Sequence, residues 1–485
     1  ATYIIIATAA VALIVYALQS RKTPPAPSGS IRTIAVLPFN TLAEERADEY
    51  LGVGMADALI TRLGNIRQVV VRPTTTVLRY TGSDRDPQKA GRELEVEAIL
   101  TGTIQRSGDK VRVTVQLAGV SDRSTLWSGR FDRDMTDIFT VQDSISQNVA
   151  DALAVRLSGG EKELLAKRYS ENNEAYQEYL KGRYYWNKRT ADGIRKAMDS
   201  FDRAIALDSN FAMAYGGLAD CYALLSWNGV MRPGQCMPKS KEMALRALEL
   251  DETLAETHVS LARAHTYFDR DARAAEREYL RAIELNPNYP TAHHWYALYL
   301  METGRTEEAL REINRAHELD PVSLIINTAV GWLYYFARDY DHAISVLENT
   351  LELDPDFFRA HVWLALAYGQ KGMFDKAIAH SERAIALSNR SSISVGALAY
   401  SYAISGRRAE ARKLLEELLA IAKQKYVPPY FVAGVYTGLG DKDKAFEWLG
   451  KAHQERSTAL LSVEPVFDPL RRDPRFRELL PSTWK

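Results

Sequence analysis

Cysteine is nearly absent from this chain. Only two cysteines, Cys221 and Cys236, occur among its 485 residues. So few thiols exclude a disulfide-built scaffold and a cysteine-rich zinc site. The sequence leaves open whether these two form a single disulfide or are unrelated thiols.

An excess of charge is also missing. Lys and Arg number 61 against 62 Asp and Glu, which gives a formal net charge of −1. A nucleic-acid-binding surface requires concentrated positive charge, so we expect no nucleic-acid contact by this chain itself. We find neither a helix-turn-helix pattern nor a kinase glycine-rich loop in the sequence.

Catalytic and metal-binding motifs are likewise lacking. "GVGMADAL" at 52–59 offers two glycines, but they lie inside an amphipathic helical pattern and favour helix packing over a dinucleotide site. His293 and His294 are adjacent, and neighbouring helical residues point in different directions. We therefore expect a non-enzymatic protein without a metal or a cofactor.

A long uncharged run stands at the start of the sequence. Residues 2–18 carry no charge. The length of this run is near the minimum for a membrane-spanning helix. We interpret 1–20 as a transmembrane anchor, with a signal peptide as the alternative. The stretch 21–30, "RKTPPAPSGS", is rich in Pro and Ser and predicts an extended linker. Its Arg and Lys favour a cytoplasmic location for the rest of the chain.

One phrase recurs through the second half of the chain. "RAIELNPNYP" at 281–290 returns as "RAHELDPVSL", "NTLELDPDFF" and "RAIALSNRSS", and "RAIALDSNFA" and "RALELDETLA" precede it. The position of its proline is held by Ser209, Glu252, Pro287, Pro321, Pro355 and Asn389. The last three steps are each 34 residues, and a fixed period of this length is typical of helical repeats.

Each repeat also carries an internal turn signal. The glycines that mark it are Gly304, Gly372, Gly406 and Gly440, and each is followed five residues later by Ala309, Ala377, Ala411 or Ala445. Glycine predicts a helix end with positive φ, and alanine allows close helix packing. Each unit is therefore expected to be a helix, a turn and a helix.

These features resemble the tetratricopeptide repeat family. The small residue of its first helix appears as Ala219, Ala262, Ala297, Gly331, Ala365 and Ala399. The aromatic residue three positions later appears as Tyr222, Tyr334, Tyr368 and Tyr402, and is replaced by His265 and Leu300. The resemblance implies about eight helical pairs over 174–456. Residues 457–485 are expected to cap the last repeat.

Residues 31–157 have a different pattern, with elements in the order β-α-β-α-β-β-β-α. "IAVLPF", "MADALITRL", "AGRELEVEAILTGTIQRSGDKVRVTVQL", "LWSGRFDRD" and "DIFTVQDSIS" resemble the TolB amino-terminal-like domain. The expected fold is thus a transmembrane helix, an α+β domain and an all-α repeat superhelix. The resemblance implies an assembly or sensing module.

Stacked helical pairs form a superhelix whose concave face is lined by the first helix of each pair. The residues expected there are Thr291, His294, Leu298, Thr328, Trp332, Tyr335, Arg359 and Gln370. This mixture of apolar, aromatic and polar side chains suits a peptide or protein partner. The alternative is that Trp332 and Tyr335 only pack between repeats.

The combination of anchor, TolB-like domain and repeats resembles the post-membrane part of bacterial CadC-like winged-helix transcriptional regulators. That resemblance implies a single-pass protein of the inner membrane with periplasmic repeats, in conflict with the charge of the linker. It predicts a sensory, partner-binding module of a regulator. The alternatives are an envelope assembly scaffold and the sensory tail of a membrane-bound serine/threonine kinase.

Overall fold

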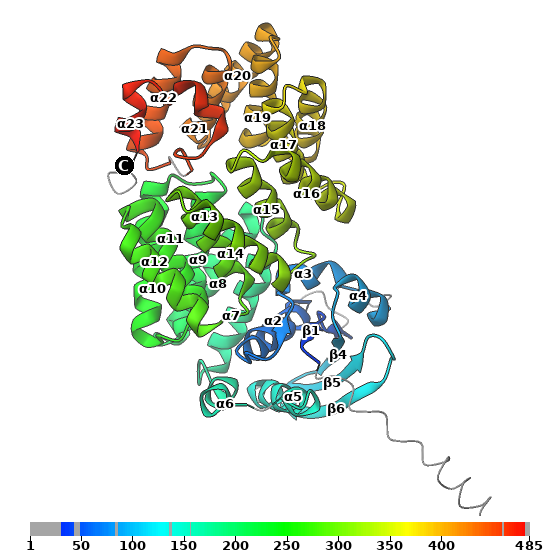
Figure 1. The fold of residues 1–485 in the computed structure, drawn as a ribbon. Coiled ribbons are helices and arrows are strands. Elements are labelled where there is room, and N and C mark those ends of the chain that lie inside the picture. The colour runs from blue at the N-terminus through cyan, green and yellow to red at the C-terminus, as the bar shows by residue number, and fades with distance from the viewer. Residues whose placement is uncertain are drawn as a thin grey trace, which may run out of the picture.

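The computed structural model describes residues 31–42, 49–82, 86–134, 138–155, 157–457 and 460–480. Within these ranges, a small α+β domain is followed by a long array of paired helices (Figure 1). The predicted outline of a small N-terminal sheet region followed by tetratricopeptide-like helical repeats is thereby confirmed.

The N-terminal domain is built on a mixed sheet, with six strands among the described residues. They are β1 (Thr33–Val36), β2 (Asn40–Thr41), β3 (Val70–Val71), β4 (Ala98–Ser107), β5 (Lys110–Gly119) and β6 (Thr125–Asp134). Their order is β3-β1-β4-β5-β6, with β2 beside β4. β1 runs parallel to β3 and β4, whereas β4, β5 and β6 are antiparallel. Alternate side chains of β5 are buried, as expected of a strand that is covered on one face only.

Helices cover both faces of this sheet. They are α2 (Glu49–Gly64), α3 (Thr74–Val77), η2 (Leu78–Tyr80), α4 (Pro87–Glu93), α5 (Ile138–Ala152) and α6 (Gly159–Ala166). The core beneath α2 and α5 continues into the first repeats. On the other face, Val322 of the repeats joins the core beneath α3 and α4. The two parts of the molecule therefore share apolar cores.

The two glycines of α2 serve close packing, as predicted. A Cβ on Gly52 would lie 2.1 Å from the carbonyl oxygen of Phe39, and one on Gly54 would lie 3.0 Å from Cβ of Leu180. Larger side chains at either position would push α2 away from its neighbours. The glycine pair is thus a packing feature of a helix.

The repeats comprise eight successive helical pairs within 157–457, a range that the structure describes throughout. They are α7 (Asn173–Asn187) with α8 (Ala191–Leu207), α9 (Ala212–Trp227) with α10 (Pro233–Leu250), α11 (Ala255–Ala264), extended by η4 (His265–Asp269), with α12 (Ala272–Leu285), α13 (Pro290–Glu302) with α14 (Thr306–Leu319), α15 (Leu324–Phe336) with α16 (Tyr340–Leu353), α17 (Phe358–Gln370) with α18 (Phe374–Leu387), α19 (Ser392–Ile404) with α20 (Arg408–Ala422), and α21 (Pro429–Gly438) with α22 (Lys442–Gln454).

The predicted glycine turns are confirmed. Gly304, Gly372, Gly406 and Gly440 have φ values between 71° and 83°, and the alanines five residues later are fully buried. In three other pairs an arginine has the positive φ, namely Arg189, Arg270 and Arg338. A non-glycine residue is strained in this conformation, so the surrounding contacts must hold these three turns in place.

The array curls until its C-terminal helices lie next to earlier repeats (Figure 1), and Arg270 after η4 donates to the carbonyl of His453 in α22 at 3.5 Å. Arg456 donates to the carbonyl of Phe268, and the backbone N–H of Leu460 donates to Glu302 at 3.2 Å. The chain then continues through η5 (Pro465–Leu470) and α23 (Pro474–Leu479). Phe467 and Phe476 of these two short helices are buried against the last repeat.

The predicted location needs correction. In the part of the chain that the structure describes, no helix is long and apolar enough to cross a membrane. The anchor expected at 1–20 and the linker at 21–30 lie outside the described residues. We therefore withdraw the location as a single-pass inner-membrane protein with periplasmic repeats. Of the two alternatives for the cysteines, the structure has separate thiols, because Cys221 and Cys236 are free and buried.

Candidate partner-binding site

The N-terminal domain is docked onto the repeats through polar contacts. The side chain of Thr76 donates to Asp320 at 2.6 Å, and Arg72 donates to the carbonyl of Leu319. Asn288 donates to the carbonyls of Arg67 and Val69 at 2.9 and 3.2 Å. These bonds join α3 and the residues around β3 to the ends of α12 and α14, so the N-terminal domain and the repeats are in direct contact.

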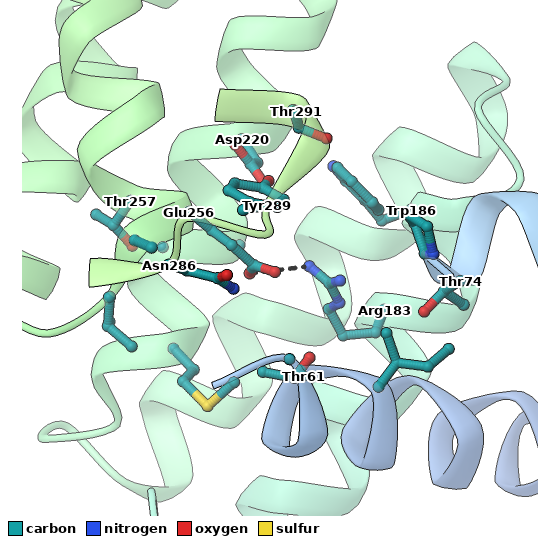
Figure 2. Close-up of a pocket in the computed structure, with 18 of the residues that line it drawn as sticks. Thr61, Thr74, Arg183, Trp186, Asp220, Glu256, Thr257, Asn286, Tyr289 and Thr291 are labelled. Carbon is teal, nitrogen blue, oxygen red and sulfur yellow. Dashed lines mark ion pairs between the residues drawn. The ribbon is translucent and has the colours of Figure 1, made fainter. Parts of the chain in front are cut away.

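A cavity of about 120 Å³ remains where the docking is incomplete (Figure 2). We call it the interdomain cavity. The segment from α2 to α3 forms one wall, and the first helices α7, α9, α11 and α13 form the other. Thr61 and Thr74 come from the N-terminal domain, whereas Glu256, Asn286 and Thr291 come from the repeats. A ligand in this cavity would therefore contact both parts of the molecule.

Arg183 of α7 is the central charge of this cavity. Its guanidinium binds Asp57 of α2 at 2.8 and 3.1 Å, and it lies 3.7 Å from Glu256 of α11 (Figure 2). Thr74 and Asn187 donate to the same Asp57 carboxylate at 2.6 and 3.4 Å. Burial alone would raise the pKa of Asp57, but the charge and hydrogen bonds of Arg183 outweigh it and lower that pKa.

The remaining acids of the cavity behave differently. Burial raises the pKa of Glu256, and it also raises the pKa of Asp220, whose carboxylate accepts a hydrogen bond from Ser260. Arg189 lies over the ring of Trp186, with 3.6 Å between guanidinium carbon and ring centroid. The cavity thus offers acids, a cation on an aromatic face, and neutral amide and hydroxyl groups. This is a surface for polar recognition.

A second cavity of about 180 Å³ lies deeper in the superhelix, and we call it the aromatic cavity. It forms where α9 and α11 face α15, α17, α21 and the residues Arg456, Ser457, Leu460 and Glu464. Seven aromatic side chains line it, namely Trp227, Tyr267, Trp332, Trp363, Tyr426, Tyr430 and Phe431. The walls of the aromatic cavity are mainly apolar, whereas many polar groups line the interdomain cavity.

The predicted groove residues are distributed between these sites. Thr291 lines the interdomain cavity, and Trp332 and Arg359 line the aromatic cavity. His294 is 4 % exposed, with its ring centroid 6.4 Å from that of Trp332, and burial lowers its pKa to about 3. Leu298 is fully buried. The structure therefore brings three of the eight residues to a cavity surface.

Three other predicted residues are engaged within the protein. Thr328 is 1 % exposed and donates to the carbonyl of Leu324 at 2.7 Å. Tyr335 is fully buried, and its hydroxyl donates to Glu464 at 2.7 Å. The segment around Glu464 thus covers a position that an ideal repeat array would leave open. Gln370 donates to the hydroxyl of Tyr400 at 3.1 Å.

Sequence reasoning missed Arg183 in the lining of the interdomain cavity and Asp57, which binds it from outside that lining. Asp57 and Arg183 are 126 positions apart, and no motif in either segment points to the other. A clearer signal was present in the repeats. His258, His293, Asn327 and His361 each lie six positions after the proline slot and bind the carbonyl of that slot at 2.7–3.0 Å. The recurring His or Asn therefore ties the start of each first helix to the preceding turn.

Parts of the chain match known protein families. Residues 30–148 match the second domain of HilA/YgeH-like transcriptional regulators. Residues 278–311 and 329–392 match tetratricopeptide repeats. The TolB-like resemblance of 31–157 stays a prediction, since the family matched over that range is the HilA/YgeH-like one.

Two relatives extend this picture. The chain is 28 % identical over 251 residues to putative adenylate cyclase 3 of Rhizobium meliloti, covering 51 % of this chain and 42 % of that protein. It is 24 % identical over 326 residues to the transcriptional regulator HilA of Salmonella typhimurium, covering 66 % and 57 %. The chain thus spans about half the length of these relatives.

Solved structures overlap only in part. The human IFIT1 dimer with PPP-AAAA has a TM-score of 0.45 at 15 % identity, covering 65 % of this chain and 78 % of that one. Yeast Tom70 has a TM-score of 0.43 at 16 % identity, covering 71 % and 82 %. The sequence matches carry the conclusion: this chain contains tetratricopeptide repeats behind a HilA/YgeH-like domain and resembles transcriptional regulators.

Proposed function

We propose that this chain is the partner-binding module of a bacterial transcriptional regulator and acts without catalysis. In this proposal it binds an extended segment of a protein partner in the interdomain cavity. The observation that carries it is the position of that cavity, with walls from both the N-terminal domain and the repeats. The step on DNA would belong to a part of the regulator outside the present sequence.

The chemistry of the lining supports a peptide as the occupant. A peptide presents amide donors and acceptors at every residue, and the cavity offers Asn286 and Thr291 from the repeats and Thr61 from α2 (Figure 2). Glu256 keeps 36 % of its side chain exposed beside Arg183. A partly buried carboxylate that faces a cavity can accept hydrogen bonds from peptide N–H groups or from a basic side chain.

The charges favour binding over catalysis. Asp57 and Arg183 are bound to each other and to neighbouring polar groups, so neither is available as a proton carrier. Their pairing instead fixes α2 against α7. An occupant that touches Glu256 would bear on the same cluster, because Glu256 lies 3.7 Å from Arg183. Partner binding would thereby be felt at the contact between the two domains.

The test is selection of peptides on the full chain from a random library, followed by fluorescence anisotropy with the selected peptides. Glu256→Gln should weaken binding about tenfold or more, since a hydrogen bond to a charged group contributes about 1.5–3 kcal/mol. Glu318→Gln is the matched control, because Glu318 is 65 % exposed on α14 and pairs only along its own helix. Equal affinities for both variants would refute the proposed site.

A further inference from the structure

The aromatic cavity carries more positive charge than its surroundings balance. Arg263, Arg359 and Arg456 line it, against a single acid, Glu464. Within the described residues, none of the three arginines forms an ion pair with a carboxylate. Arg456 is exposed to solvent, whereas Arg263 is buried and Arg359 is partly buried. A buried cation without a carboxylate partner is unfavourable in an apolar environment, so Arg263 and Arg359 favour the binding of an anion.

Arg263 shows the imbalance most clearly. Its residue is 3 % exposed, and its guanidinium lies 3.8 Å from the ring centroid of Trp295. Its one hydrogen bond goes to the carbonyl of Ala223 at 3.2 Å, and the buried Nε atom has no partner among the described residues. The contact with the Trp295 ring holds the guanidinium in place. The N–H group at Nε is left without an acceptor among the described residues.

Arg359 faces the same cavity from α17. It donates to the amide oxygen of Asn228 at 2.9 Å, a neutral group that leaves its charge uncompensated. Burial lowers the pKa of Arg359, and no acid counteracts this effect. The indole N–H of Trp332 is a further buried donor without a partner in the described part of the chain. Donors on α11, α15 and α17 are therefore available to one ligand.

Glu464 does not fill this role. The residue is 3 % exposed, and its carboxylate accepts hydrogen bonds from the hydroxyls of Tyr335 and Tyr430 at 2.7 and 3.1 Å. It also accepts from the backbone N–H of Val466 at 3.2 Å, and burial raises its pKa. Glu464 is thus engaged with neutral donors at the wall, and the cavity keeps its positive character.

The tryptophans in the walls indicate which kind of uncharged group the ligand should carry beside its anionic group. The ring centroids of Trp227 and Trp332 are 6.3 Å apart, and those of Trp332 and Trp363 are 5.0 Å apart. Rings at these spacings are in contact with one another, so the three tryptophans form an aromatic wall against which a flat ring of a ligand can pack. With about 180 Å³ of space, the cavity suits a small molecule.

We propose that the aromatic cavity binds a small organic acid with a flat aromatic body. Its carboxylate would lie between Arg263 and Arg359, and its ring would pack against the tryptophans. Because the walls come from α9, α11, α15, α17 and α21, an occupant would hold the curled array together across its concave side. This site is separate from the interdomain cavity and does not depend on the peptide proposal.

Isothermal titration calorimetry on the full chain tests the proposal, with indole-3-acetate as the probe and the neutral, nearly isosteric indole-3-acetamide as its control. We expect the acid to bind at least about tenfold more tightly than the amide, as charge-assisted hydrogen bonds require. This comparison uses the unaltered protein and needs no variant to fold. Equal binding of the two compounds, or no binding of either at millimolar concentrations, would overturn the assignment.

Variants then locate the site. Arg359→Gln should reduce the affinity for indole-3-acetate to that for the amide, with an unchanged thermal midpoint as the check on folding. Arg383→Gln is the matched control, since Arg383 is 51 % exposed and pairs with Asp356 at the surface. Glu256→Gln should leave this binding unchanged, which separates it from the interdomain cavity. Full affinity in Arg359→Gln would refute the role of the arginine.

Discussion

Removing the Asp57 carboxylate should open the contact between the N-terminal domain and the repeats. Asp57 is 2 % exposed and receives four hydrogen bonds, two of them from Arg183. In Asp57→Ala, the Arg183 side chain, 8 % exposed, keeps only the more distant Glu256 at 3.7 Å. Loss of one partner from a buried ion pair destabilises a protein by about 3–5 kcal/mol.

The double variant Asp57→Ala/Arg183→Met distinguishes this mechanism from simple loss of packing. Since it removes the uncompensated charge as well, it should be markedly more stable than Asp57→Ala alone. The pH dependence of the stability provides an independent check of this mechanism. Because the folded-state pKa of Asp57 lies below its ordinary 3.8, the stabilisation is complete above that value. It is lost as the pH falls through the lower folded-state pKa.

Native-state hydrogen exchange is the suitable assay, because a protein of several parts need not unfold in one step. Asp57 lies on α2 and Arg183 on α7, so the opening free energy of amides in these two helices should fall by about 3–5 kcal/mol. Helices α19 and α20, far along the array, serve as the internal control. A decrease below about 1 kcal/mol, the scale of an exposed pair, would refute the reasoning. So would a double variant no more stable than Asp57→Ala.

Three further outcomes are expected. Burial raises the pKa of Glu302 from 4.5 to about 8, so the thermal stability of the protein should decline as the pH rises between those values. The decline should be smaller in Glu302→Gln, and calorimetry at both ends of the pH range measures it. Gly440→Ala at φ 76° should lower unfolding stability by about 1–2 kcal/mol, whereas Gly450→Ala, with open space around it, should not. Arg338→Asn keeps a residue that tolerates positive φ but removes the bonds to Asp468, so the segment 460–480 should be cleaved faster by protease.

The repeats could be predicted because their rules are local. A glycine with positive φ followed by a buried alanine is set by contacts within one helical pair, and Gly304, Gly372, Gly406 and Gly440 all follow that rule. The arginines that take the same conformation break it. Arg338, for example, is held by Asp468, 130 positions later. A contact of that length leaves no periodic trace in the sequence.

The candidate site was less predictable, because it depends on what covers the concave face. Positions on the first helices could be assigned from the repeat pattern, and Trp332, Arg359 and Thr291 do line cavities. Tyr335 has an equivalent position but is fully buried beneath the segment that carries Glu464. No repeat rule places that segment, since its sequence lies outside the repeats.

The two cavities have a common physical origin. A superhelix of paired helices has a continuous concave surface, and in this chain the N-terminal domain covers one part of it while the segment after α22 crosses another. Each cover stops short of full contact, and a cavity remains at each limit. In the aromatic cavity, burial of Arg359 without a carboxylate partner is unfavourable, whereas Arg183 beside the interdomain cavity is already paired with Asp57. The aromatic cavity is therefore the one whose charge a bound anion would balance, in keeping with the proposal made for it.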